Sequence, residues 1–169
     1  MIRLGSLRGV AISVVALSST LTAHAQSATF EVKLLAPETA MEAARGALEH
    51  CRRQGFQVAV AVVDRSGVLQ TLVRDRFAGA HTVEAASDKA WTAASFRVPS
   101  ATLAAETQSG KSMSGLRSLS RLMAVGGGQP IEAGGSALGG IGVSGAPGGD
   151  ADDACAKAGI QAIAGNLEF

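Results

Sequence analysis

The stretch GGGQPIEAGGSALGGIGVSGAPGG, which runs from Gly126 to Gly149, decides how the rest of the chain can fold. Apolar residues recur through it, and a polar Gly-Gly-Ser triplet lies near its middle. Two apolar segments separated by such a triplet predict two strands joined by a tight turn. Glycines inside a strand mark places where another part of the structure comes close to the backbone. We therefore expect a glycine-rich hairpin at the centre of the domain, with a helix or a flat ligand against its glycines.

The segments on either side of this hairpin predict a second strand pair and several helices. Apolar runs bounded by turn residues predict strands at 57–63 and 68–74, joined by the turn Asp64–Gly67. Alanine-rich helical patterns are present at 37–54, 81–96, 100–108 and 150–164, with Ser100 as the cap of the third helix. The stretch 109–123 predicts a mobile segment with one helical turn. The predicted fold class is α+β, a central and largely antiparallel sheet with helices packed on it, like sensor-type sandwiches.

Composition argues against a nucleic-acid-binding protein. Aromatic residues make up 4% of the chain, with one tryptophan and no tyrosine, so a platform for base stacking is lacking. The chain has 15 basic and 14 acidic residues. Without the two arginines of residues 1–25 the balance is 13 basic against 14 acidic residues, or −1. Such a chain has no electrostatic preference for polyanions.

Residues 1–25 have the pattern of a secretory signal peptide. Arg3 and Arg8 supply the positive start, Val10–Leu17 is a short apolar run, and Ala23-His24-Ala25 fits a small-x-small cleavage site. The apolar run is shorter than the roughly 20 residues that span a bilayer. We therefore expect a mature single domain, residues 26–169, in the periplasm or outside the cell.

Two cysteines, Cys51 and Cys155, belong to this mature part. An oxidising compartment permits them to form a disulfide, but sequence cannot supply the required geometry. The alternative is two small buried apolar residues on different predicted helices. Neither cysteine belongs to a metal-binding or covalent haem-attachment motif. Both interpretations stay open at this level.

The sequence contains strings that resemble nucleotide-binding and catalytic motifs, but their surroundings argue against both functions. Gly140–Gly145 matches the string G-x-G-x-x-G, but it lies too close to the C-terminus for the strand and acid that a dinucleotide site needs. The following helix begins with Asp150, Asp152 and Asp153, which would repel a pyrophosphate. These aspartates favour the positive end of a helix dipole, which explains them without a metal. Ser144 lacks the elbow motif of a nucleophilic serine, so no catalytic residue is assigned.

Four segments occur in the order seen in the GlcG/HbpS-like family, which the chain resembles from about Leu35 to Ile163. They are AVAVVDRSGVLQTLVR (59–74), DKAWTAASFRVPS (88–100), GGGQPI (126–131) and GGIGVSGAPGGDADDACAKAG (139–159). The resemblance implies a profilin-like, sensor-like fold and homo-oligomers, up to octamers in the secreted branch. Members of that branch bind haem and serve a redox-sensing system, so the resemblance also implies haem and a membrane sensor as partners.

The resemblance suggests where haem would bind. Thr92 of the Lys89-Ala90-x-Thr92-Ala93 motif matches the threonine proposed near iron in the secreted branch. His50 lies on the helix that carries the ligand histidine of the adenosyltransferase-linked branch, although near its far end. His81 is a candidate iron ligand only because of its position at a loop–helix junction. The alternative is that it caps the helix. Lys89 and Arg97 are the candidates for the haem propionates.

Three functional hypotheses follow for this chain. The first is an exported, oligomeric, non-enzymatic protein that binds haem reversibly and without a covalent link, in redox sensing or haem handling. The second is an enzyme or accessory protein of small-molecule catabolism that uses a pocket beside the glycine hairpin. The third is an oligomeric module without a cofactor, in which the glycines only permit close packing.

Overall fold

A computed structural model describes residues 27–167. The expected signal peptide therefore lies outside the described residues. The chain divides into a unit that ends at Glu31 and a compact unit from Val32 onward, and the account below concerns the second. No helix in the described part of the chain is long and apolar enough to cross a membrane.

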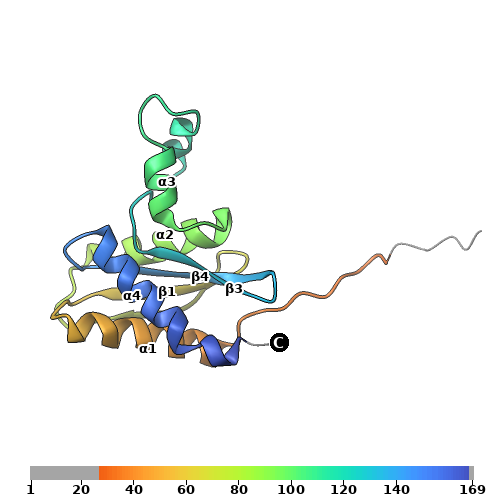
Figure 1. Ribbon diagram of the computed structural model, residues 1–169, viewed down its shortest axis with the longest axis horizontal. Helices are drawn as coiled ribbons and strands as arrows, with labels where there is room; N and C mark the ends of the chain where they lie inside the picture. The colour runs from red at the N-terminus through yellow and green to blue at the C-terminus, as the bar shows by residue number, and fades with distance from the viewer. Residues whose placement is uncertain (1–26, 168–169) are drawn as a thin grey trace, which may run out of the picture. The chain divides into compact units, whose positions relative to one another are not determined.

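The core of the domain is a four-stranded antiparallel sheet in the order β2-β1-β4-β3 (Figure 1). The strands are β1 (Ala59–Asp64), β2 (Leu69–Arg74), β3 (Gly128–Ala133) and β4 (Ser136–Ser144). Hairpins join β1 to β2 and β3 to β4, and β1 pairs with β4 at the centre of the sheet. The two predicted hairpins and the predicted fold class are confirmed. The first strand begins two residues later than predicted and includes Asp64, whose carboxylate accepts hydrogen bonds from the turn.

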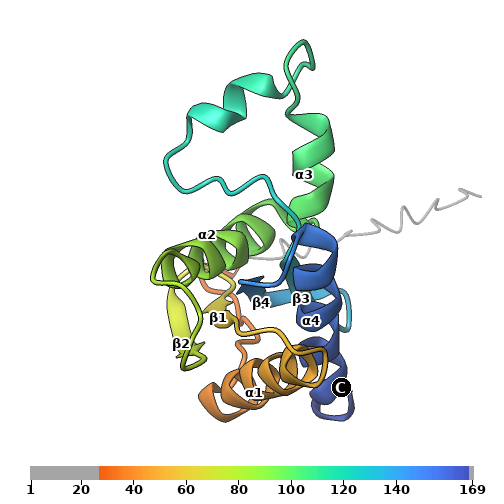
Figure 2. The same cartoon turned by 90° about the vertical axis from the view of Figure 1, so that its left-hand side faces the viewer.

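Helices cover both faces of the sheet (Figure 2). Helices α1 (Pro37–Arg53) and α4 (Gly149–Ala162) pack on one face, and α2 (His81–Phe96) packs on the other. Successive side chains of β1 point to opposite faces of the sheet, and every residue from Ala59 to Val63 is fully buried. Both faces of β1 are therefore covered by helices. Val60 and Val62 contact the α1–α4 layer, whereas Ala59, Ala61 and Val63 contact α2. This is the doubly covered strand that its continuous apolar sequence predicts.

The glycines of β4 allow α2 to lie directly on the sheet. A Cβ atom added at Gly140 would come within 2.5 Å of the Ala90 carbonyl oxygen, and one at Gly142 would meet the Ala86 carbonyl. Gly128 of β3 is equally close to the Lys89 carbonyl. Of the two partners expected at these glycines, a helix and a flat ligand, the structure therefore places the helix there.

A disulfide between Cys51 and Cys155 joins α1 to α4 beneath the sheet. The Cα atoms are 5.6 Å apart, and both residues are almost fully buried. This observation settles the alternative that the sequence left open. Gly46 and Gly159 lie where the two helices approach each other closely. A Cβ added at Gly46 would meet the Ala162 side chain, and one added at Gly159 would meet the Ala43 carbonyl oxygen.

Two short elements lie between α2 and the hairpin: α3 (Ser100–Glu106) and the 3₁₀ helix η1 (Ser114–Ser118). Ser100 was expected to cap α3, but it is the first residue of the helix and makes no capping bond. Its hydroxyl instead donates to the Val125 carbonyl oxygen at 2.6 Å and accepts the Gly128 N–H at 2.8 Å. The turn η1 falls inside the stretch for which a single helical turn was predicted. A last 3₁₀ turn, η2, spans Ala164–Asn166.

Candidate functional site

The outward side of α1 is flanked by two hollows. Helix α1 turns its alanines inward, where Ala40, Ala43 and Ala47 are fully buried, so its longer side chains project outward. Three of these, Met41, Arg45 and Glu49, follow one another at one-turn spacing and line both hollows. The larger hollow has a volume of about 530 Å³ and the smaller about 300 Å³, sizes typical of small-molecule sites.

The larger hollow lies between α1 and the end of α4 and is mostly acidic. Its lining residues are Glu38, Met41, Glu42, Arg45, Gly46, Glu49 and Ala162. Three carboxylates face one guanidinium there. An anionic ligand would be repelled from this hollow.

The smaller hollow, called the α1–β2 groove here, has a different chemistry. It is lined by Met41, Arg45, Leu48, Glu49, Arg52, Thr71 and Val73. Two arginines and one carboxylate line it, Asp75 pairs with one of the arginines, and Leu48 and Val73 provide apolar surface. Met41 is half-exposed and lines the same groove. Its thioether sulfur is a soft metal ligand. This groove suits a flat apolar ligand that carries negative charge.

The position of Arg52 at the edge of this groove is fixed by Asp75. The two groups form a bidentate pair, with Nε to Oδ2 at 2.7 Å and Nη2 to Oδ1 at 2.9 Å. Asp75 also accepts the N–H of Arg76. The Arg52 hydrogen bonds lower the pKa of the Asp75 carboxyl, and the same bonds raise the pKa of Arg52. Arg52 therefore stays charged and oriented.

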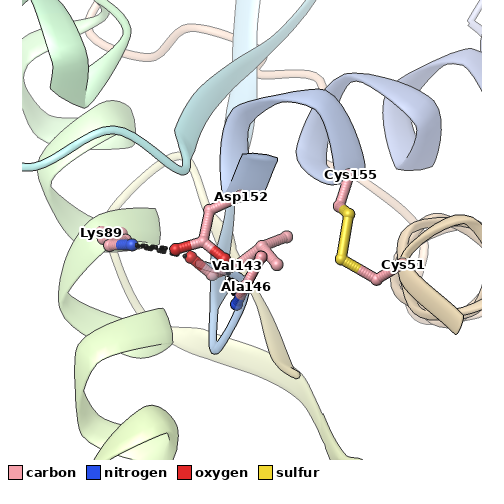
Figure 3. Close-up of a disulfide and its surroundings, with 6 residues drawn as sticks. All are labelled: Cys51, Lys89, Val143, Ala146, Asp152 and Cys155. Atoms are coloured by element: carbon pink, nitrogen blue, oxygen red, sulfur yellow. Dashed lines mark hydrogen bonds and ion pairs between the residues drawn. A yellow bond between two sulfur atoms is a disulfide. The ribbon is translucent and has the colours of Figure 1, made fainter. Parts of the chain in front are cut away.

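A buried ion pair connects α2 to α4, two helices that cover opposite faces of the sheet (Figure 3). Lys89 Nζ lies 2.7 Å from Asp152 Oδ2 and also donates to the Val143 carbonyl oxygen at 3.0 Å. The other oxygen of Asp152 accepts the Ala146 N–H at 3.0 Å. Burial raises the pKa of Asp152, and the hydrogen bond from Lys89 offsets part of that rise. Both side chains are 5% exposed, so this pair is a structural link and not an open site.

Asp153 forms a second interior link to β3. One of its oxygens, Oδ1, accepts the Gly127 N–H at 2.6 Å and the Gln129 side-chain N–H at 2.9 Å. The sequence interpretation of the acidic helix start was therefore incomplete. Asp152 and Asp153 do lie in the first turns of α4, but they bind α2 and β3 specifically.

The five residues singled out from the sequence do not converge on one site. Lys89 and Thr92 lie one turn apart on the buried side of α2, and Lys89 is already engaged by Asp152. The Thr92 hydroxyl donates to the Arg121 carbonyl oxygen at 3.3 Å and accepts the Met123 N–H at 2.9 Å. Neither side chain is presented at the surface. A ligand could reach either group only after these internal bonds had broken.

The remaining three candidates lie far from one another along the fold. His81 is exposed at the first residue of α2, whereas Arg97 follows the last residue of that helix. Arg97 has a left-handed backbone with φ of 55°. His50 is half-buried in the last turn of α1, in the layer on the other face of the sheet. Within residues 27–167, no group of three His, Cys, Asp or Glu side chains could hold a metal ion.

Comparison with known proteins identifies the relatives of this chain. Residues 35–161 match the family model described as "Haem degrading protein HbpS-like". The chain belongs to the HbpS-like family. Comparison with curated protein sequences gives no match.

Several solved structures resemble the chain in fold, and some also in sequence. A double mutant of Streptomyces reticuli HbpS is 34% identical, with a TM-score of 0.77 over 83% of this chain and 95% of that one. A structure titled as a PduOC:Heme complex is 28% identical, with a TM-score of 0.74 over 78% and 96%. The Klebsiella pneumoniae protein ORFY is 23% identical, with a TM-score of 0.80 over 83% and 97%, and supports the fold alone.

The structure brings together two of the separated segments that carry the family resemblance. The lysine of the Lys89-Ala90-x-Thr92-Ala93 motif forms its ion pair with Asp152, which belongs to the segment 139–159. Sequence reasoning missed this partnership because nothing local connects residues 63 positions apart. It also did not single out Met41 and Arg45, which line the α1–β2 groove. Their spacing opposite the alanine face of α1 was the available signal.

Proposed function

We propose that this HbpS-like protein is exported, assembles into homo-oligomers and binds haem reversibly in the α1–β2 groove. The family match over residues 35–161 is the observation that carries the proposal. A relative that shares the fold has been solved as a haem complex. The proposal assigns redox sensing or haem handling as the role, with a membrane sensor protein as the partner.

The residues of the α1–β2 groove fit haem in charge and in polarity. Arg45 and Arg52 would bind the propionates, and Arg52 is held in place by Asp75. Leu48 and Val73 would lie against the porphyrin, and the Met41 thioether would approach the iron. Bound haem would supply redox-active iron. The acidic hollow beside α4 fits haem less well because its carboxylates oppose the propionates.

Export is supported by the disulfide. Disulfides persist in oxidising compartments and are rare in the cytosol of most organisms. The Cys51–Cys155 bridge is therefore consistent with the signal-peptide pattern of residues 1–25 and with a periplasmic or secreted location.

Hemin titration of matched variants tests the proposed site. Met41→Ala and Arg45→Ala should each weaken hemin binding by about tenfold or more, equivalent to about 1.4 kcal/mol. Met41→Ala should also shift the Soret maximum of the complex, because it removes the proposed iron ligand. Met113→Ala and Arg53→Ala are the matched controls, since neither residue lines the groove. Both controls should bind hemin as the wild type does.

The ligands suggested by the family resemblance provide the competing outcome. His50→Ala, His81→Ala and Thr92→Ala should leave the Soret maximum in place if the groove is the site. Loss of the shift in His81→Ala with full binding by Met41→Ala would transfer the site to α2. A decline of the Soret band over time with peroxide present would add degradation to binding, as the family description suggests.

A further inference from the structure

The segment just before α1 has the pattern of a strand that lacks a sheet. Phe30, Val32 and Leu34 alternate with Glu31 and Lys33, which is the period of a half-buried strand. The three apolar residues are 86%, 44% and 61% exposed, and the segment belongs to no helix or strand. A run of exposed apolar side chains on one side of a segment marks an interaction surface.

The sheet offers a matching edge at β2. Among the described residues β2 pairs with β1 alone and is the terminal strand of the sheet. A bulge opposite Val62 and Val63 leaves Gln70 without a register partner, so Leu69 and Leu72 lie on the same face despite their odd spacing. These two leucines are 48% and 36% exposed. An exposed terminal strand with apolar side chains is a template for strand addition.

We propose that the segment Phe30–Leu34 of one copy adds as an antiparallel strand to the free edge of β2 in a second copy. This proposal deepens the oligomeric part of the proposed function and rests on it. The apolar side chains of the segment would cover Leu69 and Leu72 of the second copy. The backbone of the segment would complete the hydrogen bonding of β2.

Charge selects the antiparallel direction. Strand β2 ends at Arg74, and Arg76 follows after Asp75, whose charge is paired with Arg52, whereas Asp64 lies beside the start of the strand. An antiparallel segment would place Glu31 near the two arginines and Lys33 toward Asp64. A parallel segment would place Lys33 beside the arginines, where like charges repel. The antiparallel arrangement is therefore the complementary one.

The exchange would be reciprocal because each segment starts from a fixed point. Leu35 is 4% exposed, and its carbonyl oxygen accepts a hydrogen bond of 3.0 Å from the side chain of Gln70 in β2. Two copies that exchange their segments would form a closed twofold dimer with the same contact made twice. The added strand would run beside Thr71 and Val73 of the receiving copy. The copy that donates the segment would therefore also form one wall of the receiving copy's α1–β2 groove.

Oligomer mass measured on the full-length gene product tests the exchange. The wild type should be a dimer or a multiple of it at micromolar concentration by light scattering or native mass spectrometry. Val32→Pro, which removes a strand hydrogen bond, and Leu72→Lys on the receiving edge should each shift the mass toward monomer. Val125→Ser removes a similarly exposed apolar side chain elsewhere and should leave the mass unchanged. A monomeric wild type, or a Val32→Pro variant with unchanged mass, overturns the proposal.

Crosslinking identifies which copy contributes the segment. Val32→Cys and Leu72→Cys chains, tagged differently and mixed before mild oxidation, should form a disulfide between the two tags. No crosslink in the mixture, or a crosslink confined to single chains that carry both substitutions, overturns exchange between copies. Hemin titration of Val32→Pro keeps the two proposals apart. If monomeric Val32→Pro still gives a saturable Soret shift, the haem-binding proposal stands independently of the exchange. If the wild type is dimeric but gives no Soret shift, the exchange proposal stands and the haem-binding proposal fails.

Discussion

Removal of the Cys51–Cys155 disulfide should strongly destabilise the domain. The bridge closes a loop of 104 residues between α1 and α4. Chain-entropy arguments assign about 4.7 kcal/mol to a crosslink that closes a loop of about 100 residues, and measured native bridges fall at about 2–5 kcal/mol. Both cysteines are at most 1% exposed, so the two thiols would stay packed in the reduced fold. Most of the loss should therefore come from the freed unfolded chain.

The expected change in melting temperature follows from the size of the domain. Unfolding entropy near about 2.1 cal/mol/K per residue gives about 0.28 kcal/mol/K for a domain of about 135 residues. A loss of about 3–4.7 kcal/mol then lowers Tm by about 11–17 °C. The free energy of unfolding is best measured by urea denaturation, followed by far-UV circular dichroism.

The design needs two independent ways of removing the bridge. Oxidised wild type is compared with the Cys51→Ala/Cys155→Ala variant, and with wild type equilibrated in urea together with a thiol reductant. The reductant reaches the buried sulfurs through the unfolded state. A loss below about 0.5 kcal/mol, the usual limit for neutral substitutions, would refute the reasoning. Gly115→Ala, a substitution into open space, serves as the control.

Three further perturbations test the interior of the fold. Lys89→Met leaves Asp152 buried without its partner and should lower the free energy of unfolding at pH 7 by about 3–5 kcal/mol, measured by urea denaturation. The loss should be smaller at acidic pH because the Asp152 carboxyl then becomes protonated. The pKa of Asp75 is lowered in the fold, so its contribution is complete above the unfolded pKa near 4 and is lost as pH falls below it. The stability difference between wild type and Asp75→Asn should therefore shrink as pH falls below about 5. Gly142→Ala forces a methyl group against α2 and should cost about 1–3 kcal/mol, whereas Gly115→Ala should change stability by less than about 0.5 kcal/mol.

Local patterns in the sequence account for most of the elements. The turns at Gly67 and Gly134-Gly135 have positive φ, as hairpin glycines should, and both strand pairs were predicted from them. The alanine face of α1 and the continuous apolar run of β1 likewise identify their buried sides. These features depend on residues close in sequence, which is why periodicity detects them.

Contacts between distant segments were beyond this reasoning. The Lys89–Asp152 pair and the disulfide each join helices that lie far apart along the chain. The glycines of β4 indicated a close approach, but only the structure identifies α2 as the partner. The candidate site changed for the same reason. Thr92 and Lys89 belong to a recognisable motif, yet tertiary packing buries both, while the α1–β2 groove forms only where α1 crosses β2.

The two faces of the sheet have different roles in this account. On the α2 side, glycines and the buried ion pair hold the helix tightly against the strands. On the α1 side, longer side chains leave the groove open beside Arg45 and Arg52. The proposed haem site uses the α1 side of β2, whereas the proposed exchanged strand adds to the free edge of β2 and covers Leu69 and Leu72 on its α2 side.

Equilibrium titration of the purified wild-type protein with hemin, followed at the Soret band, tests the central claim most directly. The account predicts a saturable shift at micromolar protein with one hemin per chain, weakened in Met41→Ala and Arg45→Ala. A linear absorbance rise without saturation, equal to that of hemin with an unrelated protein, would contradict it.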